Sequence, residues 1–146
     1  MYQRILMPID ASSCSRYAVE EGLQLAKALT ARVTFLYVLD PYLPPVPPQS
    51  HEALRYVQQV HEDLRRAADE AMQASEAKAK EAGVPATSEV LEMSRPVDGI
   101  LEAAADHDLI VMGSHGRTGV SRFLLGSVTE GVARHSDIPV LVVRCP

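Results

Sequence analysis

The stretch DLIVMGSHGRTGVSRFLLGSV, residues 108–128, decides the fold, because it joins a buried strand to a helix through a glycine-rich connection. Its apolar run LIVMG, residues 109–113, is typical of a parallel strand that is covered on both faces. The connection that follows holds glycines, hydroxyl side chains and the basic residues Arg117 and Arg122. A helix is expected from about Ser127 to Ser136. The stretch therefore predicts an α/β protein with a loop suited to bind a ligand.

The remainder of the chain repeats this alternation of short apolar runs and helical patterns. Further strands are expected at Arg4–Ile9, Arg32–Leu39, Ala86–Met93 and Pro139–Arg144. Further helices are expected after the capping sequence DASS at residues 10–13, from His51 to Ala82, and from Pro96. Such an order predicts one domain, residues 1–146, with a five-stranded parallel sheet and helices on both faces.

The longest predicted helix follows a proline-rich segment. Five of the ten prolines lie in DPYLPPVPPQS, which predicts an irregular loop over residues 41–48. We interpret this loop as a surface excursion rather than a proline-motif ligand. The inner face of the helix is predicted from its apolar periodicity to carry Leu54, Val57, His61, Leu64, Ala68, Met72, Ser75 and Ala79.

The composition excludes several classes of function. The 146 residues are 47% hydrophobic and 23% charged, and the net charge of −5 disfavours a general nucleic-acid-binding role. No apolar run has the length of a membrane span, and residues 1–10 lack the apolar core of a signal peptide. Two cysteines are too few for a disulfide-stapled secreted domain. We therefore expect a cytoplasmic protein with no membrane association.

The cysteines and most histidines are expected to have no special role. Cys14 lies near a helix start, which favours a reactive thiolate, but no resolving cysteine is near it in sequence. We therefore interpret Cys14 as a small residue at a helix start rather than a redox sensor, and we expect Cys145, the next-to-last residue, to be mobile. No protein metal site is expected, because metal-ligand spacing is lacking at His51, His61, His107 and His135.

Ligands of open α/β sheets bind at the carboxyl ends of the strands, where the winding direction changes. Pro8, Ile9 and Asp10 end the first predicted strand, and Met112 and Gly113 end the fourth. For five strands this change normally separates the first strand from the fourth or the third. The glycine-rich connection is therefore predicted to border the ligand crevice.

The residues of that connection suit an anion such as phosphate. Gly113 and Gly116 permit tight turns and a close approach of the main chain. Gly126 and Ser127 precede a helix whose first N–H groups and dipole favour negative charge. The hydroxyls of Ser127 and Thr129 are further candidate donors. Simple turn formation by these glycines remains the alternative.

Two roles stay open for Asp10, and several common site motifs do not occur in the sequence. Asp10 is predicted to accept hydrogen bonds from ribose hydroxyls or a base amine, or else to join Ser12 and Ser13 in a helix cap. The sequence lacks the Gly-Lys-Ser/Thr of a P-loop, and no G-x-G-x-x-G follows the first strand. Ser114 does not stand in a G-x-S-x-G elbow.

The spacing Gly113-x2-Gly116-x9-Gly126-Ser127 resembles the nucleotide-binding signature of the universal stress protein family, in its ATP-binding branch. The resemblance extends over nearly the whole chain. It includes RILMPID in the first strand, FLYVLD in the second, DLIVMGSHGRTG, LLGSV and the final PVLVVR. It implies a fold like the Rossmann and adenine-nucleotide alpha hydrolase folds, with strand order 3-2-1-4-5 and ATP between the first and fourth strands.

The resemblance also implies which residues bind the nucleotide. At the adenosine end they are Pro8, Ile9, Asp10 and, through its backbone, Val38. Beside the ribose and phosphates they are Met112 and Gly113. Along the phosphate chain they are Gly116, Gly126, Ser127 and Val128. Apart from the resemblance, Arg117 and Arg122 are expected to supply positive charge in a protein that is acidic overall.

The family's ligands and partners follow from the same resemblance. A divalent ion, Mg or Mn, is expected to be held mainly by the nucleotide phosphates. A homodimer is expected through antiparallel pairing of the strand at 139–144, whose apolar edge would otherwise invite aggregation. A regulatory protein partner of unknown identity is expected because a nucleotide-dependent switch needs a partner as its output.

Two positions depart from the family pattern. Ala11 stands where the family usually has glycine in Asp-Gly-Ser, and we expect that this turn does not need positive φ, so that Ala11 is harmless. Ser94 stands where glycine is frequent, before Arg95-Pro96, and can reshape the exit of the third strand.

Three functions stay open at the level of the sequence. The first is an ATP-binding regulatory protein of the stress response, a switch or sensor with at most slow hydrolysis. The second is a weak ATPase or an enzyme of adenylate chemistry, for which His115 and Arg117 are the candidate groups; a lone loop histidine is more often solvated than a general base. The third is a protein that binds another adenine nucleotide, such as cyclic AMP.

Overall fold

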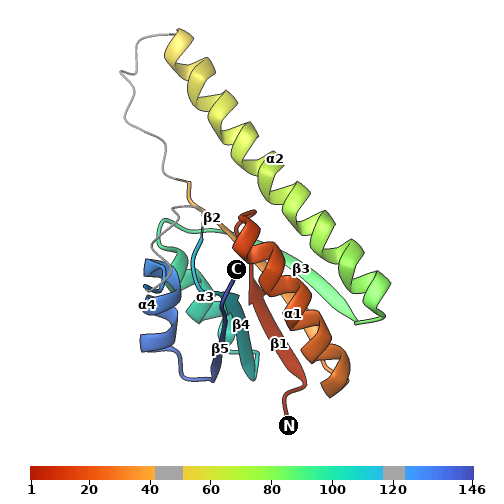
Figure 1. Ribbon diagram of the computed structural model, residues 1–146. Helices are drawn as coiled ribbons and strands as arrows, with labels where there is room; N and C mark the ends of the chain where they lie inside the picture. The colour runs from red at the N-terminus through yellow and green to blue at the C-terminus, as the bar shows by residue number, and fades with distance from the viewer. Residues whose placement is uncertain (42–50, 117–123) are drawn as a thin grey trace.

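The computed structural model describes residues 1–41, 51–116 and 124–146, and in them strands and helices alternate as the sequence predicts (Figure 1). The strands are β1 (Arg4–Pro8), β2 (Arg32–Leu39), β3 (Ala86–Glu92), β4 (Leu109–Gly113) and β5 (Val140–Val143). The helices are α1 (Ser13–Leu29), α2 (His51–Ala82), α3 (Pro96–Ala104) and α4 (Ser127–His135). The predicted bounds differ from these by at most two residues.

The five strands form one parallel sheet in the order β3-β2-β1-β4-β5, which confirms the predicted fold. Figure 1 shows α1 and α2 on one face of the sheet and α3 and α4 on the other. The chain therefore reverses its winding direction between β1 and β4, the two central strands. Crevices for ligands form at such a point.

The apolar runs form strands because alternate side chains enter two separate cores. Ile5 and Met7 of β1 lie in the core under α1 and α2, whereas Leu6 between them lies in the core under α3 and α4. All three side chains are at most 1% exposed. Burial on both faces explains why these strands read as continuous apolar runs rather than alternating ones.

Helix α1 begins at a well-capped residue and ends at a strained one. The Ser12 hydroxyl accepts a hydrogen bond from the Ser15 N–H at 3.0 Å, which confirms the predicted cap. Thr30 ends the helix in the left-handed region, with φ of 54°. A threonine there is strained, because the left-handed region costs most residues with a Cβ about 1–2 kcal/mol.

The predicted inner face of α2 is buried in the second half of the helix, is partly buried at Val57, His61 and Leu64, and is wrong at Leu54. Ala68, Met72, Ser75 and Ala79 are buried, but Leu54 is 52% exposed. Val57, His61 and Leu64 are only partly buried. The cause is length, since α2 is a 32-residue helix that extends well beyond the sheet at its first turns (Figure 1). The proline-rich segment over residues 42–48 lies outside the described residues.

The amino ends of β1 and β4 are tied together by Asp108. Its Oδ1 accepts hydrogen bonds from the N–H groups of Gln3 and Arg4, at 3.1 and 2.9 Å. Its Oδ2 lies 3.6 Å from Arg4 Nε. Partial desolvation raises the pKa of Asp108, but the two backbone hydrogen bonds and the Arg4 guanidinium together lower it below its ordinary value.

In the described part of the chain no helix has the length and apolar character needed to cross a lipid bilayer. The longest helix, α2, carries charged residues along its exposed side.

Candidate functional site

A cavity of about 220 Å³ opens at the carboxyl ends of β1 and β4. Ten of the residues predicted to bind a nucleotide line it: Pro8, Ile9, Asp10, Val38, Met112, Gly113, Gly116, Gly126, Ser127 and Val128. Arg117, the remaining predicted residue, lies outside the described residues, as does Arg122. The structure thus brings together side chains from four separate parts of the sequence.

The cavity forms where β1 ends before its neighbour β2 does. β1 pairs with β2 only as far as Pro8 opposite Leu36, whereas β2 continues beside β3 to Leu39. On the other side, β1 pairs with β4 through Ile5 and Leu6. Beyond these pairs the backbone of β2 faces open space, not another strand.

Val38 presents its backbone to that space. Leu36 directs its carbonyl toward β1, because it accepts from the Ile9 N–H at 2.8 Å. Leu39 directs its carbonyl toward β3, because it accepts from the Met93 N–H. Since the polar groups of alternate residues in a strand point to the same side, Val38 directs both its N–H and its C=O into the cavity.

The first turn of α4 forms another wall of the cavity. Its first N–H groups, at Ser127 and Val128, have no acceptor within the helix. One expectation fails here, because the Gly126 N–H donates to the Ser114 carbonyl at 2.8 Å and is not available to a phosphate. A second fails as well, since the buried Thr129 hydroxyl donates to the Gly113 carbonyl at 2.8 Å. Of the groups in this turn that were predicted to bind an anion, those of Ser127 and Val128 remain.

The glycines are needed for close approach and not for positive φ. A Cβ at Gly126 would lie 3.0 Å from His115 Cα, and one at Gly113 would lie 2.9 Å from Cys14 Sγ. A Cβ at Gly116 would collide with Asp10 Oδ2. Among the described glycines only Gly83, at the end of α2, has positive φ. Gly116 therefore gives the Asp10 carboxylate its place in the cavity.

Asp10 serves the helix cap and the cavity together. Its Oδ1 accepts from the Ser12 N–H at 3.0 Å, and its own N–H donates to the Ser15 hydroxyl at 3.2 Å. The residue also lines the cavity, where Oδ2 faces Gly116. The two roles predicted for Asp10 are thus compatible.

The expectation for Ala11 is wrong. Ala11 has φ of 64°, so the turn after β1 does adopt the left-handed region, where a Cβ is unfavourable. The usual glycine of the family would be unstrained at this position. Ser94, the other departure, is exposed between β3 and α3.

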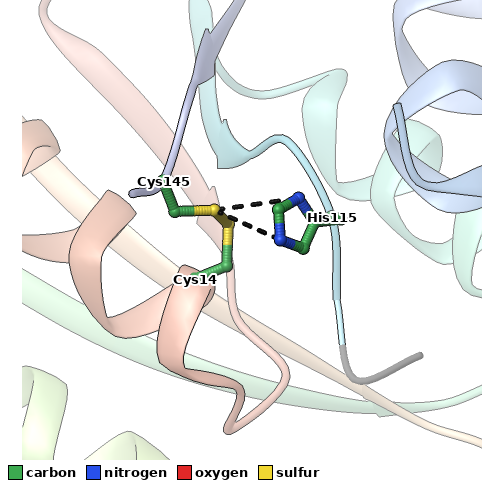
Figure 2. Close-up of side chains that lie close together, drawn as sticks. All are labelled: Cys14, His115 and Cys145. Atoms are coloured by element: carbon green, nitrogen blue, oxygen red, sulfur yellow. Dashed lines mark hydrogen bonds between the residues drawn. A yellow bond between two sulfur atoms is a disulfide. The ribbon is translucent and has the colours of Figure 1, made fainter. Parts of the chain in front are cut away.

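The expectation for the cysteines is also wrong. Cys14 and Cys145 form a disulfide, with Cα atoms 5.3 Å apart, across 131 residues of sequence. Cys145 is therefore anchored, and Cys14 has a cysteine partner. Figure 2 shows the disulfide facing the imidazole of His115, whose Nε2 and Nδ1 lie 3.7 and 3.8 Å from Cys145 Sγ.

The proximity of Cys14, His115 and Cys145 could have been predicted from the strand order. Cys14 follows β1, His115 follows β4 and Cys145 follows β5. Because these strands are parallel neighbours in the sheet, their carboxyl ends meet at one edge. Comparing residues that follow different strands, and not residues near in sequence, would have placed the three side chains together.

Comparison with known proteins agrees with this architecture. The model of the universal stress protein family matches residues 1–144. The chain belongs to the universal stress protein family. The universal stress protein MJ0531 of Methanocaldococcus jannaschii is 37% identical over 150 residues, covering 100% of this chain and 84% of the relative.

Solved structures of universal stress proteins share the fold. The universal stress protein UspA of Lactobacillus plantarum superposes with a TM-score of 0.84 at 26% identity, covering 98% of each chain. A universal stress protein solved in complex with cAMP is 27% identical with a TM-score of 0.66, covering 98% of this chain and 97% of the other.

Proposed function

We propose that this universal stress protein binds an adenine nucleotide, foremost ATP, in the cavity at the carboxyl ends of β1 and β4. It acts there as a nucleotide-dependent switch or sensor of the stress response in the cytoplasm. The observation that carries the proposal is the convergence of ten residues, predicted from the signature and its flanking strands, on one cavity.

The cavity offers complementary groups for adenosine. Leu36, Ile100 and Met112 supply apolar contact for a base and sugar. The Val38 N–H and C=O form a donor and acceptor pair that suits the adenine edge, where a ring nitrogen accepts and the amino group donates. Asp10 is an acceptor suited to ribose hydroxyls. These groups favour adenosine over an unspecific anion.

The phosphates would lie along the first turn of α4. The Ser127 and Val128 N–H groups, the Ser127 hydroxyl and the helix dipole favour negative charge there. Gly126 permits the close approach of the chain on which this arrangement depends. Asp10 is the one carboxylate among the described residues that line the cavity, so the proposed Mg or Mn ion would be held mainly by the phosphates.

Fast hydrolysis is disfavoured by the environment of His115. His115 lines the cavity, but its Nδ1 lies 3.1 Å from the Ser114 hydroxyl, and its ring lies against the disulfide, with Nε2 and Nδ1 3.7 and 3.8 Å from Cys145 Sγ. A general base needs a free nitrogen directed at the attacking water. The arrangement therefore supports a binding protein over an ATPase.

Cyclic AMP or another mononucleotide is the second candidate. The cavity, about 220 Å³, is small beside the ~300–1,000 Å³ typical of sites for drug-sized ligands. A mononucleotide fills less space than a triphosphate, and one relative was solved with cAMP. This observation favours testing the nucleotides against each other.

The test begins with protein as purified. Denaturation followed by mass spectrometry identifies any bound nucleotide, and ATP, AMP and cAMP then compete for the nucleotide-free protein. ATP bound most tightly, with less than one turnover over the binding experiment, supports the switch. If cAMP binds more tightly than ATP, cAMP becomes the proposed ligand. If none of the three nucleotides binds, the proposal is contradicted.

We also propose a homodimer through β5, together with a regulatory protein partner of unknown identity. β5 lies at the sheet edge, and Leu141 at its centre is 42% exposed. Antiparallel pairing with a second copy would cover this apolar edge. Sedimentation equilibrium tests the pairing: a monomer at all concentrations contradicts it.

A further inference from the structure

Three side chains with metal-ligating atoms come together beside the cavity. Cys14 comes from the start of α1, His115 from the segment after β4 and Cys145 from the segment after β5 (Figure 2). The two sulfurs and an imidazole nitrogen all lie within 4.8 Å of one another. Because three separate elements position these atoms, their convergence does not depend on the conformation of one loop.

The distances match those within a zinc site. With Zn–S near 2.3 Å and Zn–N near 2.0–2.1 Å, neighbouring ligand atoms of a tetrahedral site lie about 3.5–3.8 Å apart. The His115 Nε2 to Cys145 Sγ distance is already 3.7 Å. After reduction of the disulfide, rotation about the Cα–Cβ bonds can separate the sulfurs of Cys14 and Cys145 to the same spacing.

A buried hydroxyl lies among the three ligands. Ser114, which is 6% exposed, has its Oγ 3.1 Å from His115 Nδ1, 3.4 Å from Cys145 Sγ and 3.8 Å from Cys14 Sγ. Ligating histidines usually donate their second ring N–H to an oxygen, and ligating thiolates accept hydrogen bonds. Ser114 can do both, accepting from Nδ1–H while donating to a thiolate.

The two thiolates, the imidazole and the space beside them indicate which metal ion the site would bind. Two thiolates and an imidazole favour a borderline-soft ion such as Zn²⁺ over Mg²⁺ or Ca²⁺. Ser114, His115 and Cys145 also line a second hollow of about 610 Å³. A fourth ligand, water or another small group, therefore has room to complete a tetrahedral site.

We propose that the reduced protein binds Zn²⁺ through Cys14, His115 and Cys145, and that disulfide formation releases it. Two molecules of a low-molecular-weight thiol reduce the disulfide to two thiols and become a disulfide themselves. Zinc binding then displaces one proton from each thiol. In the reverse direction a small-molecule disulfide takes two electrons from the thiolates, which form the Cys14–Cys145 bond as Zn²⁺ leaves.

The test uses zinc alone, on nucleotide-free protein, because nucleotides also bind zinc. The protein is reduced with a phosphine, freed of it under inert gas, and titrated with Zn²⁺ against a chromogenic chelator. The reduced wild type is expected to bind one equivalent and the oxidised protein none. Co²⁺ in place of Zn²⁺ is expected to give a thiolate-to-metal charge-transfer band.

Variants separate this site from chance zinc binding. Cys145→Ser and His115→Gln should each weaken binding by roughly 100-fold or more, and Ser114→Ala by roughly 10-fold, the size typical of outer-shell partners. His61→Gln, on α2 and far in sequence from the cluster, should leave it unchanged. If the buried Cys14→Ser variant does not fold, Cys145→Ser and His115→Gln decide.

Two results would overturn the proposal. One is zinc affinity in the reduced wild type no higher than in the Cys14→Ser/Cys145→Ser or His115→Gln variants. The other is equal zinc binding by the oxidised and reduced protein, since a disulfide sulfur is not a thiolate ligand. Neither result bears on nucleotide binding, which is measured separately with the metal-free protein.

Discussion

The two ends of the central strands β1 and β4 have opposite construction. At the amino ends, the Asp108 carboxylate binds two backbone N–H groups and the Arg4 guanidinium, so the polar groups there are satisfied within the protein. At the carboxyl ends, β1 stops short of β2, and α4 presents N–H groups that have no acceptor within the helix. The same pair of strands is thus closed at one end and open at the other.

The contrast shows where this fold stabilises itself and where it is adapted to a ligand. At the closed end, removing one of the Asp108 interactions should lower the free energy of unfolding. The open end contains close glycine contacts around the cavity. Backbone strain alone does not mark it, because Thr30, before β2, has positive φ just as Ala11 does. Variants at the two ends should therefore change different measured quantities.

The largest expected effect is on nucleotide affinity at the open end. Gly116→Val places a Cβ against Asp10 Oδ2 and moves the carboxylate from its place in the cavity. We expect nucleotide affinity to fall by roughly 100-fold, about 2.7 kcal/mol. A smaller loss of folding stability, about 0.5–1.5 kcal/mol, is expected as well, because the Asp10 carboxylate also accepts the hydrogen bond from the Ser12 N–H. Isothermal titration calorimetry with ATP measures it. Gly113→Val is less suitable, because its Cβ would meet Cys14 and disturb the disulfide.

A variant at the closed end provides the matched control for Gly116→Val. Asp108→Ala should bind ATP as tightly as the wild type. Equal loss of affinity in both variants would mean that the two ends are not independent and would contradict the comparison.

The next effect is on stability at the closed end. Asp108→Ala removes the acceptor of the Gln3 and Arg4 N–H groups, and should lower the free energy of unfolding by about 1–2 kcal/mol. Urea denaturation measures the change. Asp106→Ala, at an exposed position two residues away, should change stability by less than ~0.5 kcal/mol. If Asp108→Ala and Asp106→Ala lower the free energy of unfolding equally, the Asp108 hydrogen bonds do not contribute to stability.

At the open end, one substitution is expected to raise the free energy of unfolding, by a smaller amount. Ala11→Gly relieves the left-handed strain but adds backbone entropy to the unfolded chain, so the net gain should be about 0.5–1 kcal/mol. Ala77→Gly, at an exposed position inside α2, should instead cost about 1 kcal/mol. Thermal denaturation compares the stability of the two variants with that of the wild type. Destabilisation by Ala11→Gly would mean that the φ of Ala11 is not positive in solution.

The smallest effect is the pH dependence of the closed end. Because the folded-state pKa of Asp108 is lowered, its contribution to stability is present above the unfolded-state value of about 3.9 and is lost as pH falls through the lower folded-state value. The stability difference between wild type and Asp108→Asn should therefore shrink as the pH is lowered through and below the unfolded-state value. A difference that widens on acidification would contradict the assigned cause.

The strands and most of the cavity could be predicted from the sequence because burial on two faces leaves a local signature. Runs such as LIVMG at 109–113 need no knowledge of the rest of the chain. The residues of the open end could be predicted for the same reason, since each directly follows or ends a recognisable strand or precedes a helix. The family resemblance supplied Val38, whose role depends on which strand ends first.

The remaining features depend on contacts that are distant in sequence or on backbone geometry. The pairing of Cys14 with Cys145 requires the strand order, and the positive φ of Ala11 is set by how the turn meets α1. The Gly126 N–H is occupied by Ser114, which no spacing reveals. The exposure of Leu54 follows from the length of α2 relative to the sheet.

The most direct test of an open and a closed end is an amide NMR titration with ATP. We expect chemical-shift changes at the N–H groups of Val38, Gly116, Ser127 and Val128, at the carboxyl ends of the strands. We expect no change at the N–H groups of Gln3, Arg4 and Asp108. Changes at the amino ends that equal those at the carboxyl ends, or none at Ser127 and Val128 at saturation, would contradict this expectation.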